Sequence, residues 1–127
     1  MATALDQVGG DLNIHSASIP IYLSATLTAD DTDNHDYIFS GNGKSVQTVH
    51  VYNGANQTLT TTLYGSQTSD GAVGSAGTVS IGSFTTAATT GGYECCSDPF
   101  PYYIIRLTYG STPDGSSTYL YVNTGVD

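Results

Sequence analysis

The sequence contains very little positive charge. Two cationic side chains, Lys44 and Arg106, stand against eleven acidic ones among 127 residues, so the formal net charge is −9. Binding to nucleic-acid phosphates requires clustered Lys and Arg, and so does attraction to an anionic membrane surface. The sequence therefore argues against nucleic acid and membranes as partners.

The acidic side chains are almost all aspartate, and this bears on the solvent in which the protein works. Ten are Asp and one is Glu. Exposed charges of one sign repel each other, and roughly 1 M salt shortens the range of that repulsion to about 3 Å. The composition predicts a protein adapted to very salty water. The alternative is an acidic domain whose charge only prevents nonspecific association.

Long apolar runs and a leader sequence are also missing. The longest apolar-leaning run, residues 19–27, is interrupted by Ser24 and Thr26, and no run approaches the ~20 residues of a membrane-spanning helix. Residues 1–13 lack the basic and apolar regions of a signal peptide. We expect a soluble protein made in the cytoplasm without a signal peptide.

Helix-forming residues are scarce, whereas Thr, Ser, Tyr, Val and Gly are abundant. Apolar side chains alternate with polar ones in short segments, a pattern typical of half-buried strands. Without a helical crossover, this predicts an all-β fold: a single antiparallel β-sandwich, jelly-roll or immunoglobulin-like, of about seven to eight strands. The sandwich should span residues 18–127, after an irregular N-terminal arm over residues 1–17. Seven strands are predicted, at residues 19–27, 37–39, 45–52, 57–64, 79–84, 103–109 and 118–122.

The last two predicted strands have a strong turn signal between them. Pro113-Asp114-Gly115 combines the fixed φ of proline with the positive φ open to glycine. We therefore expect strands 103–109 and 118–122 to form a hairpin. Its second strand should carry Thr118, Leu120 and Val122 on one face and Tyr119 and Tyr121 on the other.

An acidic segment is the best candidate for a metal site. Asp31, Asp33 and His35 occupy positions 1, 3 and 5 of a calcium-loop spacing, but position 6 is Asp36 where Gly is required. The main expectation is a solvated acidic turn. The alternative is a weak site for calcium, magnesium or sodium at Asp31, Asp33 and Asp36. No other cofactor is expected.

The two cysteines, Cys95 and Cys96, are adjacent and are predicted to lie in a loop. Reduced thiols are the main expectation, and a strained vicinal disulfide or bonds to a neighbouring subunit are the alternatives. The histidines are scattered, and no nucleophile–base motif is present, so no catalytic residue is predicted and the protein is not expected to be an enzyme. Asn56-Gln57-Thr58 matches a glycosylation sequon, a triplet that also arises by chance.

Tyrosine is unusually common, with ten Tyr, three Phe and no Trp. The main interpretation is aromatic packing between strands within one domain, and the alternative is a contact surface, because Tyr is enriched at interfaces. Arg106 is expected to pair with a carboxylate inside the domain or across an interface. An exposed sheet edge invites pairing, so the arm is expected to lie against an edge of its own domain or of a neighbour. The candidate interface residues are Leu5, Val8, Leu12, Ile14, Tyr102, Arg106, Tyr119 and Tyr121.

Two stretches resemble a known family. The run from Pro101 to Thr108 (PYYIIRLT) and the run from Ser111 to Ser116 (STPDGS) resemble the C-terminal hairpin of small β-sandwich proteins in tailed-virus virions. Residues 49–54 and 59–65 are similar to the middle strands of those proteins, and the likeness covers roughly residues 45–122.

The resemblance implies a capsid decoration or turret-base protein without catalytic residues, bound to the major capsid protein and to copies of itself. With the charge composition it suggests a virus of a halophilic archaeon. The expected function is therefore a non-enzymatic structural protein of the virion, on the capsid or the tail. The alternative is a β-sandwich module that binds carbohydrate or a cation.

Overall fold

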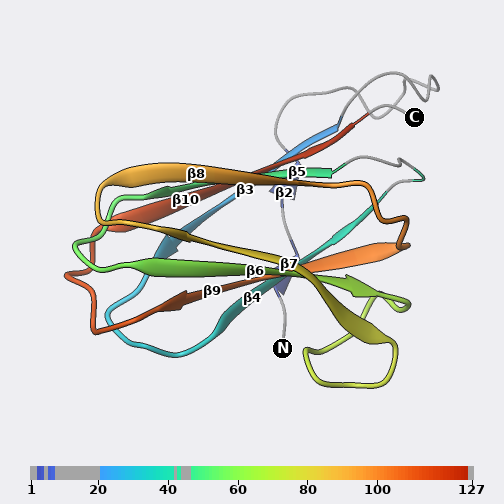
Figure 1. The fold of residues 1–127 in the computed structure, drawn as a ribbon, viewed down its shortest axis with the longest axis horizontal. Helices are drawn as coiled ribbons and strands as arrows, with labels where there is room; N and C mark the ends of the chain where they lie inside the picture. The colour runs from blue at the N-terminus through green and yellow to red at the C-terminus, as the bar shows by residue number, and fades with distance from the viewer. Residues whose placement is uncertain (1–2, 5, 8–20, 42, 44–46, 126–127) are drawn as a thin grey trace.

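The computed structural model describes residues 3–4, 6–7, 21–41, 43 and 47–125, and within them every regular element is a β-strand. Two strands of two residues precede eight longer ones (Figure 1). The fold is therefore the all-β sandwich predicted from the sequence. The strands are β1 (Thr3–Ala4), β2 (Asp6–Gln7), β3 (Ile21–Thr28), β4 (His35–Ser40), β5 (Gln47–Asn53), β6 (Leu59–Ser66), β7 (Thr78–Thr86), β8 (Thr90–Cys96), β9 (Tyr102–Tyr109) and β10 (Ser117–Thr124).

The strands form two five-stranded sheets that face each other. Sheet A has the order β1-β4-β9-β6-β7, and sheet B has the order β2-β3-β10-β5-β8. The eight longer strands pair from the outside inward, β3 with β10, β4 with β9, β5 with β8 and β6 with β7, all antiparallel. This is the pairing of a long hairpin rolled into two sheets, so the sandwich is a jelly roll rather than an immunoglobulin-like fold.

The core lies between the sheets and follows from the alternation in the sequence. Along β5 and β10 the inward positions are buried and the positions between them are more exposed, and β6 and β9 follow the same alternation except at Ser66 and Ile104, which are also buried. Val49 and Val51 of sheet B and Ile105 and Leu107 of sheet A have no exposed surface. Burying one such side chain contributes about 1.5–3 kcal/mol, which makes the alternation the main determinant of these strands.

A buried asparagine holds two turns of the sandwich together. Asn53, at the end of β5, has no exposed surface. Its Nδ2 donates to the carbonyl oxygens of Gln57 at 2.7 Å, Ala87 at 3.1 Å and Thr86 at 3.3 Å, and its Oδ1 accepts from the backbone N–H of Ala55 at 3.0 Å. One side chain therefore links the β5–β6 turn to the β7–β8 connection.

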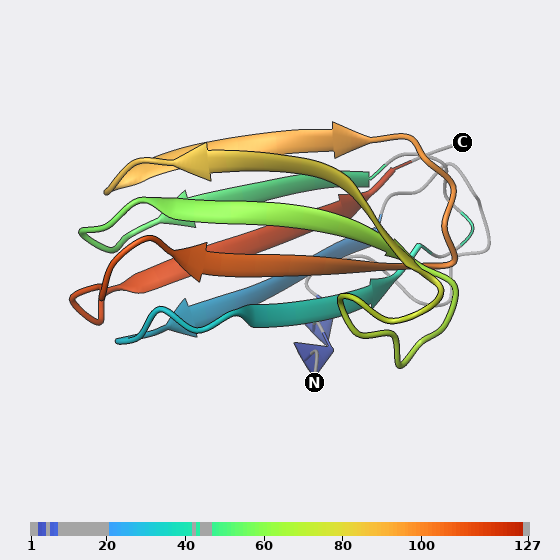
Figure 2. The same cartoon turned by 60° about the horizontal axis from the view of Figure 1, so that its bottom comes forward.

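The described part of the predicted arm pairs with its own domain. β1 lies parallel to β4, with Thr3 opposite Tyr37, and β2 lies antiparallel to β3, with Asp6 opposite Ser24. β1 in sheet A and β2 in sheet B thus lie at the same margin of the sandwich (Figure 2). Four of the candidate interface residues, Leu5, Val8, Leu12 and Ile14, lie outside the described residues.

Two predictions about elements are wrong. Strands β9 and β10 do not form a hairpin, because β9 pairs with β4 and β6 in sheet A whereas β10 pairs with β3 and β5 in sheet B. The turn at Pro113-Asp114-Gly115 instead carries the chain from one sheet to the other. The cysteines are not in a loop but at the end of β8, a strand that the sequence analysis missed because Gly91 and Gly92 leave it without an apolar alternation.

Candidate interaction surface

The outer face of sheet B carries most of the exposed aromatic surface. The structure has six exposed large hydrophobic side chains among its described residues, and five of them are tyrosines on this face. They come from all four long strands of the sheet. Their exposed fractions are 43% for Tyr22 on β3, 40% for Tyr52 on β5, 69% for Tyr93 on β8, 40% for Tyr119 and 44% for Tyr121 on β10. We call these five residues the tyrosine face.

The strand register places these side chains in adjacent rows. Tyr121 lies opposite His50 on β5, and His50 lies opposite Tyr93 on β8. The rings of His50 and Tyr121 stack with centroids 5.7 Å apart and an interplanar angle of 19°. In the neighbouring row, Tyr119 lies opposite Tyr52. Directly opposed side chains interact across strands, so these two rows carry cross-strand aromatic pairs, whereas Tyr22 lies opposite Asn123 in the next row.

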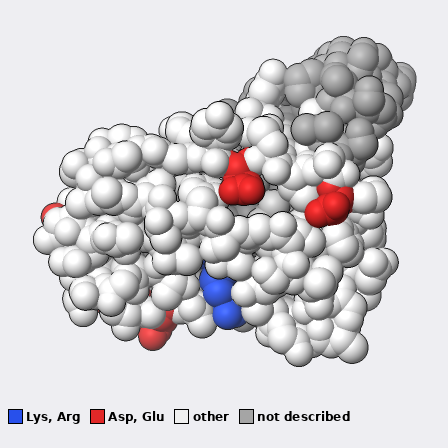
Figure 3. Space-filling model, viewed as in Figure 1, with Lys and Arg blue, Asp and Glu red and all other residues white. Residues whose placement is uncertain are grey.

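The tyrosine face carries no formal charge among the described side chains of the four long strands. The outward positions between the tyrosines are filled by Ser, Thr, Asn, Gly, Cys95 and His50. The one acidic residue in these strands, Glu94, lies on the inner side, where its carboxylate is near Gly82. In the view of Figure 3, acidic side chains form separate patches on a largely uncharged surface. In a chain of net charge −9, the part of this face formed by the four long strands thus carries no charged side chain.

The candidate interface residues do not share one surface. Tyr119 and Tyr121 belong to the tyrosine face, whereas Tyr102 and Arg106 are on β9 in sheet A. Both are partly buried. The sequence analysis missed Tyr22, Tyr52 and Tyr93. Their positions in the strand alternation, out of phase with Leu23 and Val51, were the signal for Tyr22 and Tyr52, while Tyr93 could not be found because β8 was not predicted.

Arg106 forms the carboxylate pair predicted for it, within the domain. Its Nε donates to Oδ1 of Asp36 at 2.7 Å, and a terminal guanidinium nitrogen donates to Oδ2 of the same carboxylate at 2.9 Å. The two residues are opposite each other on β9 and β4. The bond to Asp36 raises the pKa of Arg106 above its already high ordinary value, so the guanidinium stays charged. Its role in the structure is to join two strands of sheet A.

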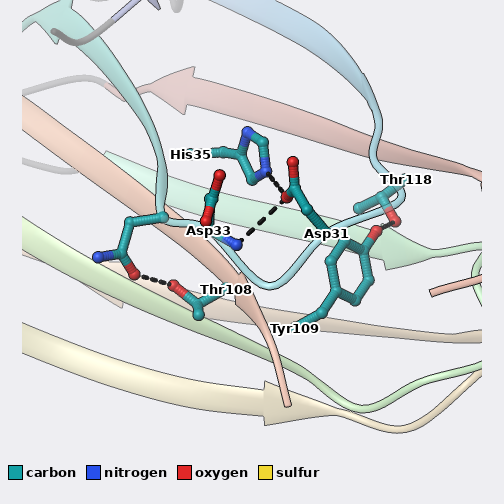
Figure 4. A network of polar contacts seen from close by, with 7 residues as sticks. Asp31, Asp33, His35, Thr108, Tyr109 and Thr118 are labelled. Atoms are coloured by element: carbon teal, nitrogen blue, oxygen red, sulfur yellow. Dashed lines mark hydrogen bonds and ion pairs between the residues drawn. The ribbon is translucent and has the colours of Figure 1, made fainter. Parts of the chain in front are cut away.

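The acidic segment does not assemble into a metal site. The Asp31 carboxylate bonds to Nε2 of His35 at 2.8 Å and accepts the backbone N–H of Asp33 at 3.2 Å (Figure 4). Asp36 instead faces Arg106. No group of three His, Cys, Asp or Glu side chains that could hold a metal exists among the described residues. The structure thus does not gather Asp31, Asp33 and Asp36 into one group of ligands.

Hydroxyl groups also bond across the same end of the sandwich. Oγ1 of Thr108 donates to Oδ1 of Asn34 at 2.7 Å, which fixes the segment before β4 to β9. The hydroxyls of Tyr109 and Thr118, both buried, bond to each other between the two sheets (Figure 4). Burial raises the pKa of Tyr109 above its ordinary value, so its hydroxyl remains protonated and able to donate. These contacts stabilise the fold.

Both cysteines are free thiols that point to different sides of β8. Cys95 is exposed on the outer face, and Cys96 is buried on the inner face. Burial raises the pKa of Cys96 above its ordinary value, which favours the inert thiol over the thiolate. Neighbouring residues of a strand face opposite ways, so this geometry does not suit a vicinal disulfide.

Comparisons with known proteins show a likeness in fold. No protein family and no curated protein matches the chain. Among solved structures, the crystal structure of the PBSX exported protein XepA superposes with a TM-score of 0.64 at 18% sequence identity. The match covers 100% of this chain and 46% of XepA, so the chain spans about half the length of that protein. None of the described residues forms a helix long and apolar enough to cross a membrane.

Proposed function

We propose that this chain is a non-enzymatic structural protein of a virus particle, which attaches to neighbouring proteins through the tyrosine face. The observation that carries the proposal is that the four long strands place no charged side chain on that face, although the chain has a net charge of −9. Interfaces are depleted of charge at their centre and enriched in Tyr, whose apolar ring and polar tip suit a surface that is exposed before assembly and buried after it.

Two further observations support a virion protein. The jelly roll is an architecture that viral capsid domains use, although lectins share it and a fold alone does not specify function. The likeness to the PBSX exported protein XepA is loosely compatible with a phage-related structural protein. A host among the halophilic archaea has no support from these comparisons, and the proposal does not depend on it.

A place on the outer capsid lattice is the specific form of this proposal, with the major capsid protein and further copies of the chain as partners. A lattice-bound protein needs only modest contact per copy, because linked contacts raise avidity by roughly 10²–10⁴. Such a protein would reinforce the shell or form the base of a surface spike. A tail-associated position is the alternative location within the same function.

The composition of purified particles tests the proposal. We expect a stoichiometric band of 13.2 kDa on denaturing gels of particles that encode the chain, identified by peptide mass. Labelled antibody should place it on the capsid surface, and labelling of tails alone would move it to the alternative location. Particles that lack the band would overturn the proposal.

A matched pair of variants tests the attachment face. Tyr121→Asp introduces a charge into the tyrosine face, and Thr85→Asp introduces the same charge at an exposed position of β7 in sheet A. We expect Tyr121→Asp to reduce incorporation into particles at least about tenfold, since burying an unpaired carboxylate at an interface is costly. Thr85→Asp should be incorporated normally. Equal incorporation of both variants would exclude the tyrosine face as the attachment surface.

Carbohydrate binding is the second candidate function, and the same face favours it. Tyrosine rings flanked by Ser, Thr and Asn combine apolar area with hydrogen-bonding groups, which suits a neutral sugar. Saturable binding on a glycan array that Tyr121→Ala abolishes, together with absence of the chain from particles, would favour this function. No specific observation favours the cation-binding alternative, because Asp36 pairs with Arg106 and no group of three possible metal ligands occurs among the described residues.

A further inference from the structure

The four margins of the two sheets are not equally protected. At one side of the sandwich, β1 pairs with the edge of β4, and β2 pairs with the edge of β3. At the other side, β7 carries an irregularity opposite Leu63 and Tyr64, where its register with β6 shifts. Covering strands and bulges are devices by which proteins prevent edge-to-edge pairing.

Strand β8 has neither of these devices. It pairs with β5 in unbroken register over all seven residues, from Thr90 opposite Asn53 to Cys96 opposite Gln47, and it contains no proline and no lysine. Among the described residues, no strand pairs with its other edge. Figure 2 shows β8 as the outermost strand of its sheet at this margin. Its central residue, Tyr93, is the most exposed large hydrophobic side chain described, at 69%.

We infer that β8 is a self-pairing edge, through which two copies of this chain form a dimer with antiparallel β8 strands and a continuous sheet B. The inference is independent of the proposed function, since it concerns the edge of the sheet and not its outer face. Like the proposed attachment, it places Tyr93 at a protein contact.

Symmetry selects the register of the pair. Directly opposed residues in neighbouring strands point to the same face. A two-fold axis perpendicular to the sheet must therefore run midway between the two copies of one residue of β8, which then lie opposite each other. The midpoint of Thr90–Cys96 is Tyr93, and only an axis there pairs all seven residues. Tyr93 then lies opposite Tyr93 of the second copy as an aromatic cross-strand pair.

The same register also accommodates Glu94, the one charged residue of the strand. An inward-pointing charge near an edge normally opposes pairing, and Glu94 is such a residue. With the axis at Tyr93, Glu94 lies opposite Gly92 of the second copy, so the two carboxylates are never directly opposed. An axis at Glu94 would oppose them directly and would pair only five residues. The sequence Gly-Gly-Tyr-Glu around the midpoint is therefore self-complementary in one register.

The net charge of the chain provides a test of whether a second copy pairs with β8. Two chains of net charge −9 repel each other, and salt screens that repulsion. The dimer should therefore tighten as salt rises. A partner of positive charge on this edge would bind more weakly in salt, so the sign of the salt dependence separates the two occupants.

Sedimentation equilibrium of the full chain with a matched pair of variants tests the inference. Tyr93→Lys sets two lysines opposite each other at the axis, while Val79→Lys introduces a lysine at an exposed position of β7, in the other sheet and outside the tyrosine face. We expect wild type and Val79→Lys to dimerise alike at molar salt and Tyr93→Lys to dimerise about tenfold more weakly, because the aromatic cross-strand pair is replaced by two like charges. A monomeric wild type at every salt concentration would overturn the inference. So would dimerisation that Val79→Lys weakens and Tyr93→Lys leaves intact.

Cysteine cross-linking tests the register. Opposed residues of antiparallel strands have Cα atoms about 4.5–5.5 Å apart, which suits a disulfide. In a Cys95→Ser background, Tyr93→Cys should yield a cross-linked dimer under mild oxidation, and Tyr22→Cys should not. A dimer that Tyr93→Cys fails to cross-link would refute the register centred on Tyr93.

Discussion

At the scale of single residues, Asn53 is the side chain on which the most backbone groups depend. Asn53→Ala removes the partner of three carbonyl oxygens and of one N–H without removing the groups themselves. We expect the free energy of unfolding to fall by about 2–4 kcal/mol, since buried polar groups left without partners are costly. Urea denaturation measures the loss, and Asn56→Ala, an exposed change in the same turn, should cost less than about 0.5 kcal/mol.

Two exposed carboxylates, those of Asp31 and Asp114, make the stability of the protein depend on pH. The bond to His35 holds the pKa of Asp31 below its ordinary value of 3.8, and the backbone N–H of Ser116 does the same for Asp114. A folded-state pKa below the unfolded value stabilises the protein above pH 3.8, and this contribution is lost as pH falls through the folded pKa. Urea denaturation between about pH 5 and pH 2 should therefore show a steeper loss for wild type than for Asp31→Asn/Asp114→Asn. If stability fell equally steeply with pH in the wild type and the double variant, Asp31 and Asp114 would not be the source of this pH dependence.

At the scale of elements, the connection between β7 and β8 contains a strained residue. Thr89 has a φ of 54°, a left-handed conformation that β-branched residues rarely adopt. Thr89→Asn should raise the free energy of unfolding by about 1 kcal/mol, because Asn tolerates this conformation. Thr90→Gly, one residue later and inside β8, should lower it, since glycine weakens a strand. Both effects can be read from denaturant midpoints.

The sequence predicted strands where one face is plainly apolar and failed where the strand is an edge. Leu120 and Val122 alternate with tyrosines because β10 is central and buries one face, so the strand and the division of its residues between two faces were both predicted correctly. Strand β8 buries little, and its glycines look like a loop. The mistaken hairpin has another cause: the turn at Pro113-Asp114-Gly115 looks the same whether it joins partners within a sheet or connects two sheets. Pairing of β10 with β3, far away in sequence, is not encoded locally.

The candidate surface was predicted only in part, because its composition depends on which strands are neighbours in sheet B. Tyr119 and Tyr121 were identified from alternation within one strand, and Arg106 was expected to find a carboxylate. That Tyr22, Tyr52 and Tyr93 join the same face depends on the order of strands in sheet B. That Tyr102 lies in the other sheet depends on it as well. The composition of a surface built from four strands becomes visible only when the topology is known.

At the scale of the whole molecule, the net charge predicts how stability depends on salt. The aspartates repel each other through dilute buffer, and the Debye length shrinks from about 10 Å at 0.1 M to about 3 Å at 1 M salt. The melting temperature should therefore rise by about 5 °C or more over this range. Asp33→Asn/Asp70→Asn, which removes two exposed charges, should show a smaller rise. A melting temperature that does not change with sodium chloride would show that the acidic composition serves solubility alone.

The first residues of the chain have a consequence for how copies associate. Thr3–Ala4 and Asp6–Gln7 pair with β4 and β3 at the side of the sandwich opposite β8. In each molecule, the edge of β8 is therefore available for pairing, and the edges of β3 and β4 are covered. Pairing of two like ends closes after one step and stops at two subunits. Without residues 1–7, β8 of one molecule could meet the vacated β3 margin of the next, and that head-to-tail union has no closing step. The shortened chain should therefore assemble into fibres visible by electron microscopy. In the full chain, this short segment would prevent such open-ended assembly.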